Sequence, residues 1–168
     1  NTAFDGVVFK GIDADFNSDF FSFFGMSDAI ALPTKNDIWI SKQLAKKLSL
    51  KIGDRVPIYF ASSQTTMPKR RSCNIIGLFN TGFADYDDTY IIGHIELIRS
   101  LYGWDENQVG AFEVFLYDDS NLDSESNIIY DSIDAIIDVQ SIEEQFPEIF
   151  NWIKLFGTNI SLIIIIMI

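Results

Sequence analysis

The hydrophobic pattern at the start of the chain predicts a strand followed by a helix. "FDGVVFKGID" places Val7, Val8 and Phe9 between two glycines, and a short run of strand-forming residues bounded in this way is typical of a β-strand. "DFNSDFFSFFG" then spaces its apolar residues at helical intervals and predicts a short amphipathic helix. Its apolar face carries Phe16, Phe20, Phe23 and Phe24.

The middle of the chain predicts alternating strands and helices. Ile38 and Ile40 mark a short strand, after which Ser41 caps a helix that carries Leu44, Ala45 and Leu48 on one face. Strict alternation predicts strands at 55–60 and 72–79, joined by "ASSQTTMPKRR" at 61–71. A further strand ends at 92, a helix covers about 94–101, and "VGAFEVFLYDD" reads as another strand.

The last third predicts two helices separated by a short strand. Isoleucines at intervals of three and four predict an amphipathic helix over 121–137, and "IDVQ" predicts a strand. Ser141 and Glu144 then form a capping-box signature, which predicts a helix that runs on toward the C-terminal residues. The fold class expected is α+β: a mixed sheet with several short helices in 1–140, as one body or two lobes, and a separate helix in 141–168.

The apolar run "NISLIIIIMI" admits two interpretations, a buried core strand or the start of a transmembrane helix. It covers about half of the roughly 20 residues that a membrane crossing needs. Trp152 and Lys154 precede it, and such a pair is typical of a membrane interface, so we favour a truncated transmembrane helix. The membrane-entering residues expected are Trp152, Lys154, Ile160, Leu162, Ile163, Ile164, Ile165, Ile166, Met167 and Ile168.

Charge and cysteine content narrow the classes of partner and chemistry. The net charge of −12 argues against nucleic acid as a partner, because a phosphate backbone would be repelled. A single cysteine, Cys73, allows no internal disulfide, and its place among alternating apolar residues predicts a small half-buried side chain. The chain begins without a methionine or a signal-peptide pattern, and we expect it to be a fragment of a longer product.

Three features of the sequence are candidate chemical sites. His94 is the only histidine and lies at a strand-to-helix junction, where a capping or surface role is expected rather than a zinc or catalytic one. "DADFNSD" resembles the start of a calcium loop, which needs Gly at its sixth place and Glu at its twelfth. Here those places are Ser18 and Phe24, so calcium binding is not expected. The acidic cluster Asp85, Asp87 and Asp88 predicts a solvated turn, or else paired carboxylates in a soluble hydrolase or ligand-binding domain.

Four stretches resemble the extracytoplasmic domain of ABC-transporter permeases of the MacB, FtsX and LolC/LolE type. They are "WISKQLAKKLSLKIGDRV", "IIGLFNTGFADYD", "GAFEVFLYD" and "IFNWIKLFGTNISLIIIIMI", which follow one another in the family's order over nearly the whole chain. The family segment G-x-F-x-x-G-x-x-x-Y-D is matched by Gly77, Phe79, Gly82, Tyr86 and Asp87.

The resemblance implies a MacB-like periplasmic core domain on the outer side of an inner-membrane permease, without enzyme activity or cofactor. Its implied role is to couple cytoplasmic ATP hydrolysis to lipoprotein release or efflux of periplasmic substrates, by mechanical transmission across the membrane. The implied partners are an ABC ATPase subunit and a second permease copy or paralogue, with the membrane around them. A periplasmic lipoprotein carrier or an outer-membrane component is a further implied partner.

A basic group of residues in the connection at 61–71 is the candidate partner-binding site. In LolC-like members a long hairpin at the corresponding place grips the lipoprotein carrier, whereas the connection here is short. Its dense positive charge on an acidic chain suits an acidic partner surface, and a solvated hairpin tip is the alternative. The residues are Met67, Pro68, Lys69, Arg70 and Arg71.

Overall fold

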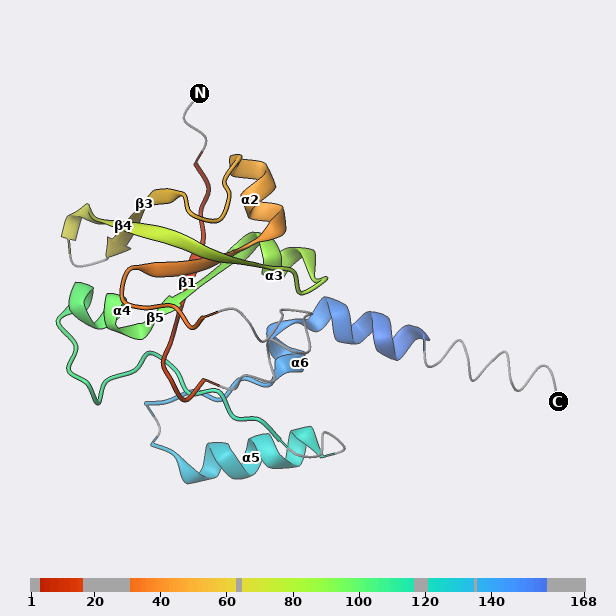
Figure 1. Cartoon of the computed structure of the whole chain (residues 1–168). Helices are drawn as coiled ribbons and strands as arrows, with labels where there is room; N and C mark the ends of the chain where they lie inside the picture. Colours follow the sequence, from red (N-terminus) through yellow and green to blue (C-terminus); the bar gives the residue numbers. More distant parts are fainter. Residues whose placement is uncertain (1–3, 17–30, 63–64, 117–120, 135, 157–168) are drawn as a thin grey trace. The chain divides into compact units, whose positions relative to one another are not determined.

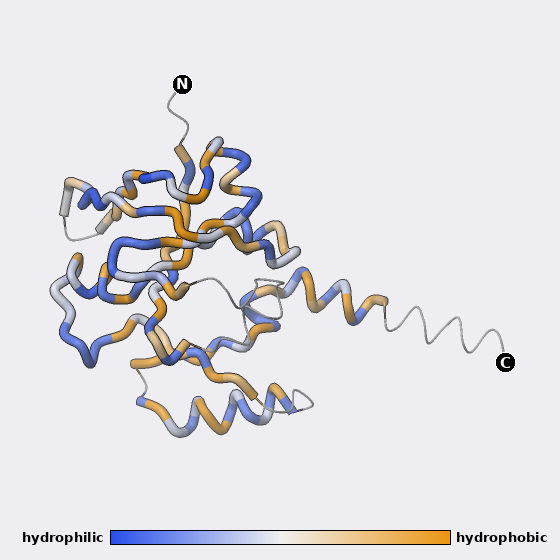
Figure 2. Tube along the Cα trace, viewed as in Figure 1, coloured by the Kyte–Doolittle hydropathy of each residue, from blue (hydrophilic) through white to orange (hydrophobic). Residues whose placement is uncertain are grey.

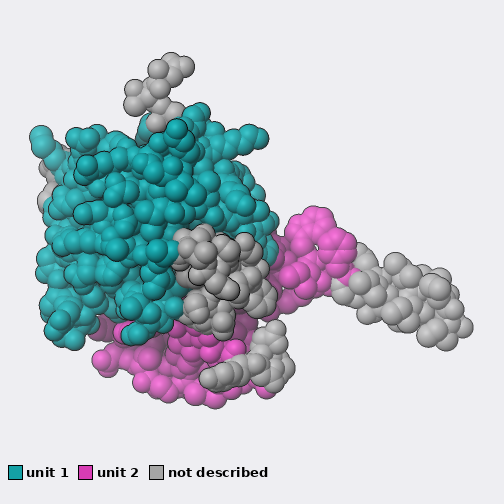
Figure 3. All heavy atoms as spheres, viewed as in Figure 1, with its two compact units in different colours: residues 1–110 teal, residues 111–168 magenta. Residues whose placement is uncertain are grey.

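The computed structural model describes residues 4–16, 31–62, 65–116, 121–134 and 136–156. They belong to two compact units, Asn1–Gly110 and Ala111–Ile168, which are coloured separately in Figure 3. The division falls between 110 and 111, whereas the sequence suggested a boundary at 140. The predicted phenylalanine-rich helix lies outside the described residues from position 17 onward.

The first unit is built on a mixed five-stranded sheet in the order β1-β5-β2-β4-β3 (Figure 1). β1–β5 and β2–β4 are parallel pairs, while β2–β5 and β3–β4 are antiparallel. The α+β class with a mixed sheet is therefore confirmed for the first unit. The strands are β1 (Val8–Ile12), β2 (Asp37–Ser41), β3 (Arg55–Ser62), β4 (Thr65–Phe79) and β5 (Tyr90–His94).

The apolar core divides between the two faces of this sheet, because neighbouring residues of a strand point to opposite sides. Ile38 and Ile91 belong to the larger cluster, which also receives the buried side chains of α2 (Lys42–Leu48) and α4 (Ile95–Tyr102). Trp39 and Ile92 belong to a smaller cluster, which Phe79 completes. Adjacent residues of one strand thus stabilise both layers.

The helices of the first unit begin and end at residues suited to those positions. Ser41 caps α2 as predicted, since its Oγ accepts a hydrogen bond from the backbone N–H of Leu44. α4 ends at Gly103, whose φ of 72° is the left-handed conformation that glycine adopts without strain. A third helix, α3 (Ala84–Thr89), fills the short connection between β4 and β5.

The connection predicted at 61–71 is corrected by the structure, because most of it is strand. β3 continues to Ser62 and β4 begins at Thr65, so only 63–64 join them. β2 pairs with β4 from Asn74 onward, and the part of β4 before that residue pairs with β3 alone. The basic residues predicted to lie on a loop are therefore part of a two-stranded extension of the sheet.

The second unit contains α5 (Leu122–Ser132), α6 (Ile142–Gln145) and a further helical segment at 147–156. The capping box of Ser141 and Glu144 is confirmed, with both of its hydrogen bonds present. Three predictions are corrected: the helix from 121 ends at 132, no strand forms at 137–140, and the described residues of 109–119 are not strand. The predicted continuous C-terminal helix is interrupted at Phe146.

No described residue between 111 and 156 is buried, whereas the first unit has a substantial core. Apolar residues nevertheless recur along the second unit's helices (Figure 2). Outside the helices, Ile136 is 92% and Phe112 is 80% exposed.

Candidate functional site

The acidic cluster is divided by the fold rather than gathered into one site. Asp87 is 2% exposed, and its Oδ1 accepts hydrogen bonds from the backbone N–H of Thr81 at 3.0 Å and from the Thr81 hydroxyl at 2.9 Å. These bonds close the turn after β4, where Gly82 has a φ of 80°. One oxygen of the Asp87 carboxylate therefore stabilises the turn.

The backbone of Asp87 makes a second connection, to the start of α2. Its carbonyl oxygen accepts a hydrogen bond from the hydroxyl of Ser41, which is fully buried. The same Ser41 oxygen accepts from Leu44, as described above. One buried hydroxyl thus joins β2, α2 and α3, and the sequence identified only its capping role.

The other two aspartates of the cluster have different surroundings. Asp85 is exposed in the first turn of α3. Asp88 Oδ2 accepts from Gln43 Nε2 at 2.8 Å, which ties α3 to α2. The pKa of Lys47 is raised chiefly by its ion pair with Asp5, at 2.6 Å, and additionally by the charge of Asp88. Asp88 therefore faces α2, while Asp87 points into the turn.

The family-like motif G-x-F-x-x-G-x-x-x-Y-D consists of residues that build this corner. Phe79 is buried at the end of β4 and meets the ring of Tyr86 edge-on, with centroids 6.3 Å apart. Tyr86 in turn stacks on Tyr90 at 4.5 Å. Together with the turn glycine and Asp87, these rings position α3 against the smaller core cluster. The motif has a structural role here.

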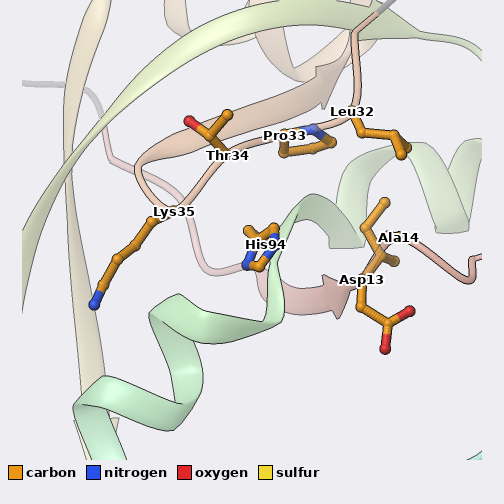
Figure 4. Close-up of a pocket in the computed structure, with 8 residues that line it drawn as sticks. Asp13, Ala14, Leu32, Pro33, Thr34, Lys35 and His94 are labelled. Atoms are coloured by element: carbon orange, nitrogen blue, oxygen red, sulfur yellow. The ribbon is translucent and has the colours of Figure 1, made fainter. Parts of the chain in front are cut away.

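A small hollow of about 280 Å³ lies at the junction of β5 and α4 (Figure 4). His94 lines it and caps α4, because its Nδ1 accepts from the backbone N–H of Glu96 at 3.1 Å, which confirms the capping role expected. The charged ends of Lys35 and Asp13 point away from its centre in Figure 4. Convergent polar groups, which a ligand site needs, are therefore not gathered in this hollow.

Asp37 opens β2 beside this hollow and has a lowered pKa. Burial raises its pKa, but hydrogen bonds from Thr34 and Asn74 outweigh that effect, so the pKa is lowered overall. Asn74 Nδ2 donates to Asp37 Oδ1 at 3.2 Å, and the Thr34 hydroxyl donates to Oδ2. The ionised carboxylate thus holds β2, β4 and the preceding turn together.

The candidate basic residues lie on two faces of the β3–β4 hairpin. Met67, Lys69 and Arg71 share one face, and Pro68 and Arg70 share the other, because strand residues alternate. Arg70 is exposed and lies opposite Tyr59, which is 61% exposed. The residues thus form two surfaces rather than the single patch that the sequence suggested.

Lys69 is engaged by the fold itself. Its Nζ donates to the carbonyl oxygen of Leu101 at the C-terminus of α4 and lies 6.0 Å from the centroid of the Tyr102 ring. Tyr102 donates its hydroxyl hydrogen to the carbonyl oxygen of Ala61 at 3.1 Å, so α4 and the hairpin are joined twice. A lysine near the C-terminus of a helix stabilises the carbonyl groups that are free at that helix end. Lys69 therefore attaches the hairpin to α4 in addition to contributing positive charge.

The helical segment 147–156 carries the described part of the predicted membrane-entering residues. Trp152 is 61% exposed, with its ring 5.7 Å from that of Phe156, and Ile153 and Leu155 are similarly exposed. Lys154 pairs with Glu143 at 2.6 Å, and this pair raises the pKa of Lys154 and joins the segment to α6.

The rest of the predicted membrane-entering set lies outside the described residues. It consists of Ile160, Leu162, Ile163, Ile164, Ile165, Ile166, Met167 and Ile168.

Among the described residues, no helix is both long and apolar enough to cross a bilayer. Within the same described ranges, no three His, Cys, Asp or Glu side chains are placed to hold a metal ion.

No protein-family model matches the chain, and no curated protein matches it significantly.

The buried contacts of Asp87 predict a large and selective effect on stability. Asp87→Ala should lower the free energy of unfolding by about 1–3 kcal/mol, because it leaves the partly buried N–H and hydroxyl of Thr81 without their acceptor. Asp85→Ala, a matched change on the exposed side of α3, should cost less than about 0.5 kcal/mol. Urea unfolding of the three proteins measures both values, and equal losses would contradict this role.

The lowered pKa of Asp37 predicts loss of stability in acid. A carboxyl whose pKa is lower in the folded than in the unfolded state stabilises the fold above its unfolded pKa, and this contribution disappears as pH falls through the folded pKa. The difference in unfolding free energy between the wild type and Asp37→Asn should therefore shrink between about pH 5 and pH 3. Urea titrations across that range measure the difference, and a gap that stays constant would contradict the assignment.

Proposed function

We propose that the chain is the extracytoplasmic part of an ABC-transporter permease of the MacB, FtsX and LolC/LolE type. In this role it is a non-catalytic body in the periplasm, attached to the inner membrane. It transmits the motion driven by cytoplasmic ATP hydrolysis to lipoprotein release or to efflux of a periplasmic substrate. The partners proposed are the ATPase subunit and a second permease copy or paralogue.

The observation that carries this proposal is the exposed apolar helix at 147–156. All of its residues from 151 to 156 are exposed, and they include two aromatic rings and a lysine. The apolar sequence that begins at Ile160 follows three residues later. A helix that presents Trp and Lys immediately before an apolar run suits entry into a bilayer. The ion pair between Lys154 and Glu143 would transmit movement of that helix to α6.

The corner around Asp87 supports the same proposal. The positions that resemble the family's motif form a connected structural unit of turn, ring stack and buried hydrogen bonds. A body that transmits force needs such a stiff connection between its sheet and its helices. The mixed sheet and its two core layers are compatible with a MacB-like domain, which we include in the proposal.

The alternative, a hydrolase using Asp85, Asp87 and Asp88, is less well supported. Its central carboxylate would have to leave Thr81 in order to act on a substrate, which would open the turn after β4. Asp88 is directed to Gln43 on α2, and Asp85 is the one exposed member of the three. The cluster therefore lacks the shared pocket that acid–base chemistry requires.

Purification of the intact gene product from its own cells tests the proposal. After mild detergent extraction of the membranes, an affinity-tagged product should copurify with an ABC ATPase subunit at comparable abundance, identified by mass spectrometry. The complex should hydrolyse ATP in a vanadate-sensitive reaction. A matched product in which Ile163 and Ile165 are changed to Asp should lose membrane retention, because charges within a bilayer are costly.

Recovery of the tagged wild-type product in the soluble fraction, or from membranes without any ABC ATPase, would contradict the proposal.

A further inference from the structure

β3 forms an open edge of the sheet in the first unit. It is the last strand in the order β1-β5-β2-β4-β3, and among the described residues it pairs with β4 alone. An open edge leaves backbone N–H and C=O groups available to another strand, and proteins commonly use such edges to bind extended segments. The residues of β3 therefore determine which segment this edge suits.

The register with β4 identifies the backbone groups at this edge. The N–H of Ile75 donates to the carbonyl of Asp54 at 2.9 Å, and in an antiparallel pair such bonded positions recur at every second residue. The positions of β3 that exchange backbone bonds with β4 are therefore 56, 58 and 60. The residues between them, Arg55, Pro57 and Tyr59, direct their backbone groups away from β4.

Pro57 agrees with this assignment. Proline has no N–H, and a strand tolerates it where that N–H would point away from the neighbouring strand. The groups left at the edge are the N–H of Arg55 and of Tyr59 and the carbonyl oxygens of all three residues. An antiparallel strand lying alongside can thus exchange backbone bonds in both directions with Arg55 and with Tyr59, and can donate one to Pro57.

The two faces of the sheet beside the edge differ in character. On one face the half-buried residues at 56, 58 and 60 are all apolar and pack against the larger core cluster. On the opposite face Arg55 and Tyr59 are exposed, together with Arg70, which lies opposite Tyr59 on β4. An added strand would therefore meet apolar side chains on one face, and two arginines and a tyrosine on the other.

The two arginines of the exposed face are placed to receive carboxylates. The Nε of Arg55 donates to the neutral hydroxyl of Ser72 at 2.9 Å, which orients the guanidinium along this face. Among the described residues no carboxylate forms an ion pair with Arg55 or with Arg70. A guanidinium presents its N–H groups in a plane that matches a carboxylate, so acidic side chains of a bound strand would be stabilised here.

Positive charge is concentrated in the part of the sequence that contains this edge. Residues 38–84, which include β2, α2, β3 and β4, contain eight of the twelve basic residues and one of the twenty-four acidic residues. The chain as a whole has a net charge of −12. A partner of negative charge is therefore attracted to this region, although the rest of the chain repels it.

The same features disfavour pairing between the β3 edges of two copies. An antiparallel pair centred on Pro57 would place two prolines opposite each other, and neither could donate a backbone bond. It would also gather Arg55 and Arg70 of both copies on one face of the joined sheet. Like charges that face each other on a sheet are destabilising, so the edge suits an oppositely charged partner rather than itself.

We propose that the β3 edge binds an extended segment of a partner protein in which acidic residues alternate with apolar ones. Antiparallel pairing, slightly the more stable direction, sets the acidic side chains beside Arg55 and Arg70. The apolar side chains then cover the exposed parts of Ile58 and Phe60. This site goes beyond the proposed function and does not depend on it, because the pairing requires neither an ATPase nor a transported substrate.

A capped heptapeptide of alternating glutamate and valine tests the pairing on the full chain by amide hydrogen exchange. The protein is kept in non-ionic detergent micelles, which cover the apolar C-terminal run equally in every variant. With the peptide at about 1 mM, the N–H groups of Arg55 and Tyr59 should exchange several times more slowly. The N–H of Cys73, in the interior of the hairpin, should stay protected with and without peptide and report that the fold is intact.

Methylation of the peptide backbone separates strand pairing from simple charge attraction. In the proposed register the glutamates opposite Arg55 and Tyr59 donate their N–H groups to β3, whereas the valine N–H groups point away. A peptide N-methylated on its glutamates should therefore leave both protein N–H groups unprotected. A peptide N-methylated on its valines, which has the same charge, should still protect them.

Charge reversal on the protein tests the chemistry of the partner. Arg55→Glu/Arg70→Glu should raise the dissociation constant of the peptide about tenfold or more, because like charges then meet. Lys42→Glu/Lys46→Glu makes the same change of net charge on exposed positions of α2 and should raise it less than about twofold. A peptide of alternating lysine and valine should bind the Arg55→Glu/Arg70→Glu protein better than the wild type.

Four results would overturn the proposal. Unchanged exchange at Arg55 and Tyr59 in the presence of the peptide would show that the edge does not bind it. Equal weakening by the two reversal variants, or protection by the glutamate-methylated peptide, would show charge attraction without strand pairing. Protection that rises with protein concentration alone would show that a second copy occupies the edge.

Discussion

The buried contacts of Ser41 and Asp87 are the interaction on which the first unit depends. One hydroxyl caps α2 and donates to the Asp87 carbonyl, while the Asp87 carboxylate closes the turn after β4. β2, α2, β4 and α3 therefore meet at a single corner. Since both side chains are almost wholly removed from water, each hydrogen bond there is costly to lose and hard to replace.

That corner also determines which strand residues face each of the two core clusters. Ile38 and Trp39 enter opposite clusters from the strand that ends at Ser41, and Phe79 enters the smaller cluster from the strand that ends at the Asp87 turn. Fixing the ends of β2 and β4 thus fixes which residues face each layer. The contacts of Lys69 and Tyr102 do the same at the other end of the hairpin, between β3–β4 and α4.

The second unit differs from the first in the burial of its apolar side chains. Its described residues are rich in acidic and large apolar side chains, but none of them is buried. Such a composition repels its own copies in solution while leaving apolar surface to be covered, so specific contacts with oppositely charged surface or with lipid are favoured. The proposed membrane attachment uses the part of this unit from 147 onward.

The local elements of the first unit could be predicted because their signals are local. The Ser41 cap and the strands on either side of α2 follow from residues a few positions apart. The role of Asp87 could not, because its partners come from residue 41, far away in sequence, and from a turn whose shape depends on Gly82. The available signal is an aspartate six residues after Thr81, but an acidic cluster in such a place more often indicates a solvated turn.

Periodicity was misleading where tertiary contacts decide the outcome. "AFEVFL" alternates like a strand, but residues 111–116 have no regular secondary structure, and the isoleucines after 132 continue a helical spacing that the backbone does not follow. The connection predicted at 61–71 is too long, because Pro68 and three charged residues are typical of a loop. In the structure these residues belong to β4 and extend it beyond its pairing with β2.

The central claim is that a folded outer domain joins a membrane through its C-terminal helix, and nitroxide accessibility tests it most directly. With Cys73 changed to Ala, single cysteines at positions 85, 152 and 165 can each carry a spin label in neutral lipid vesicles. The account predicts that the label at 165 is reached by oxygen but not by a water-soluble nickel chelate, that 152 is intermediate, and that 85 is fully reached by the chelate. A label at 165 that the chelate reaches as readily as at 85, or that neither reagent reaches, would contradict it.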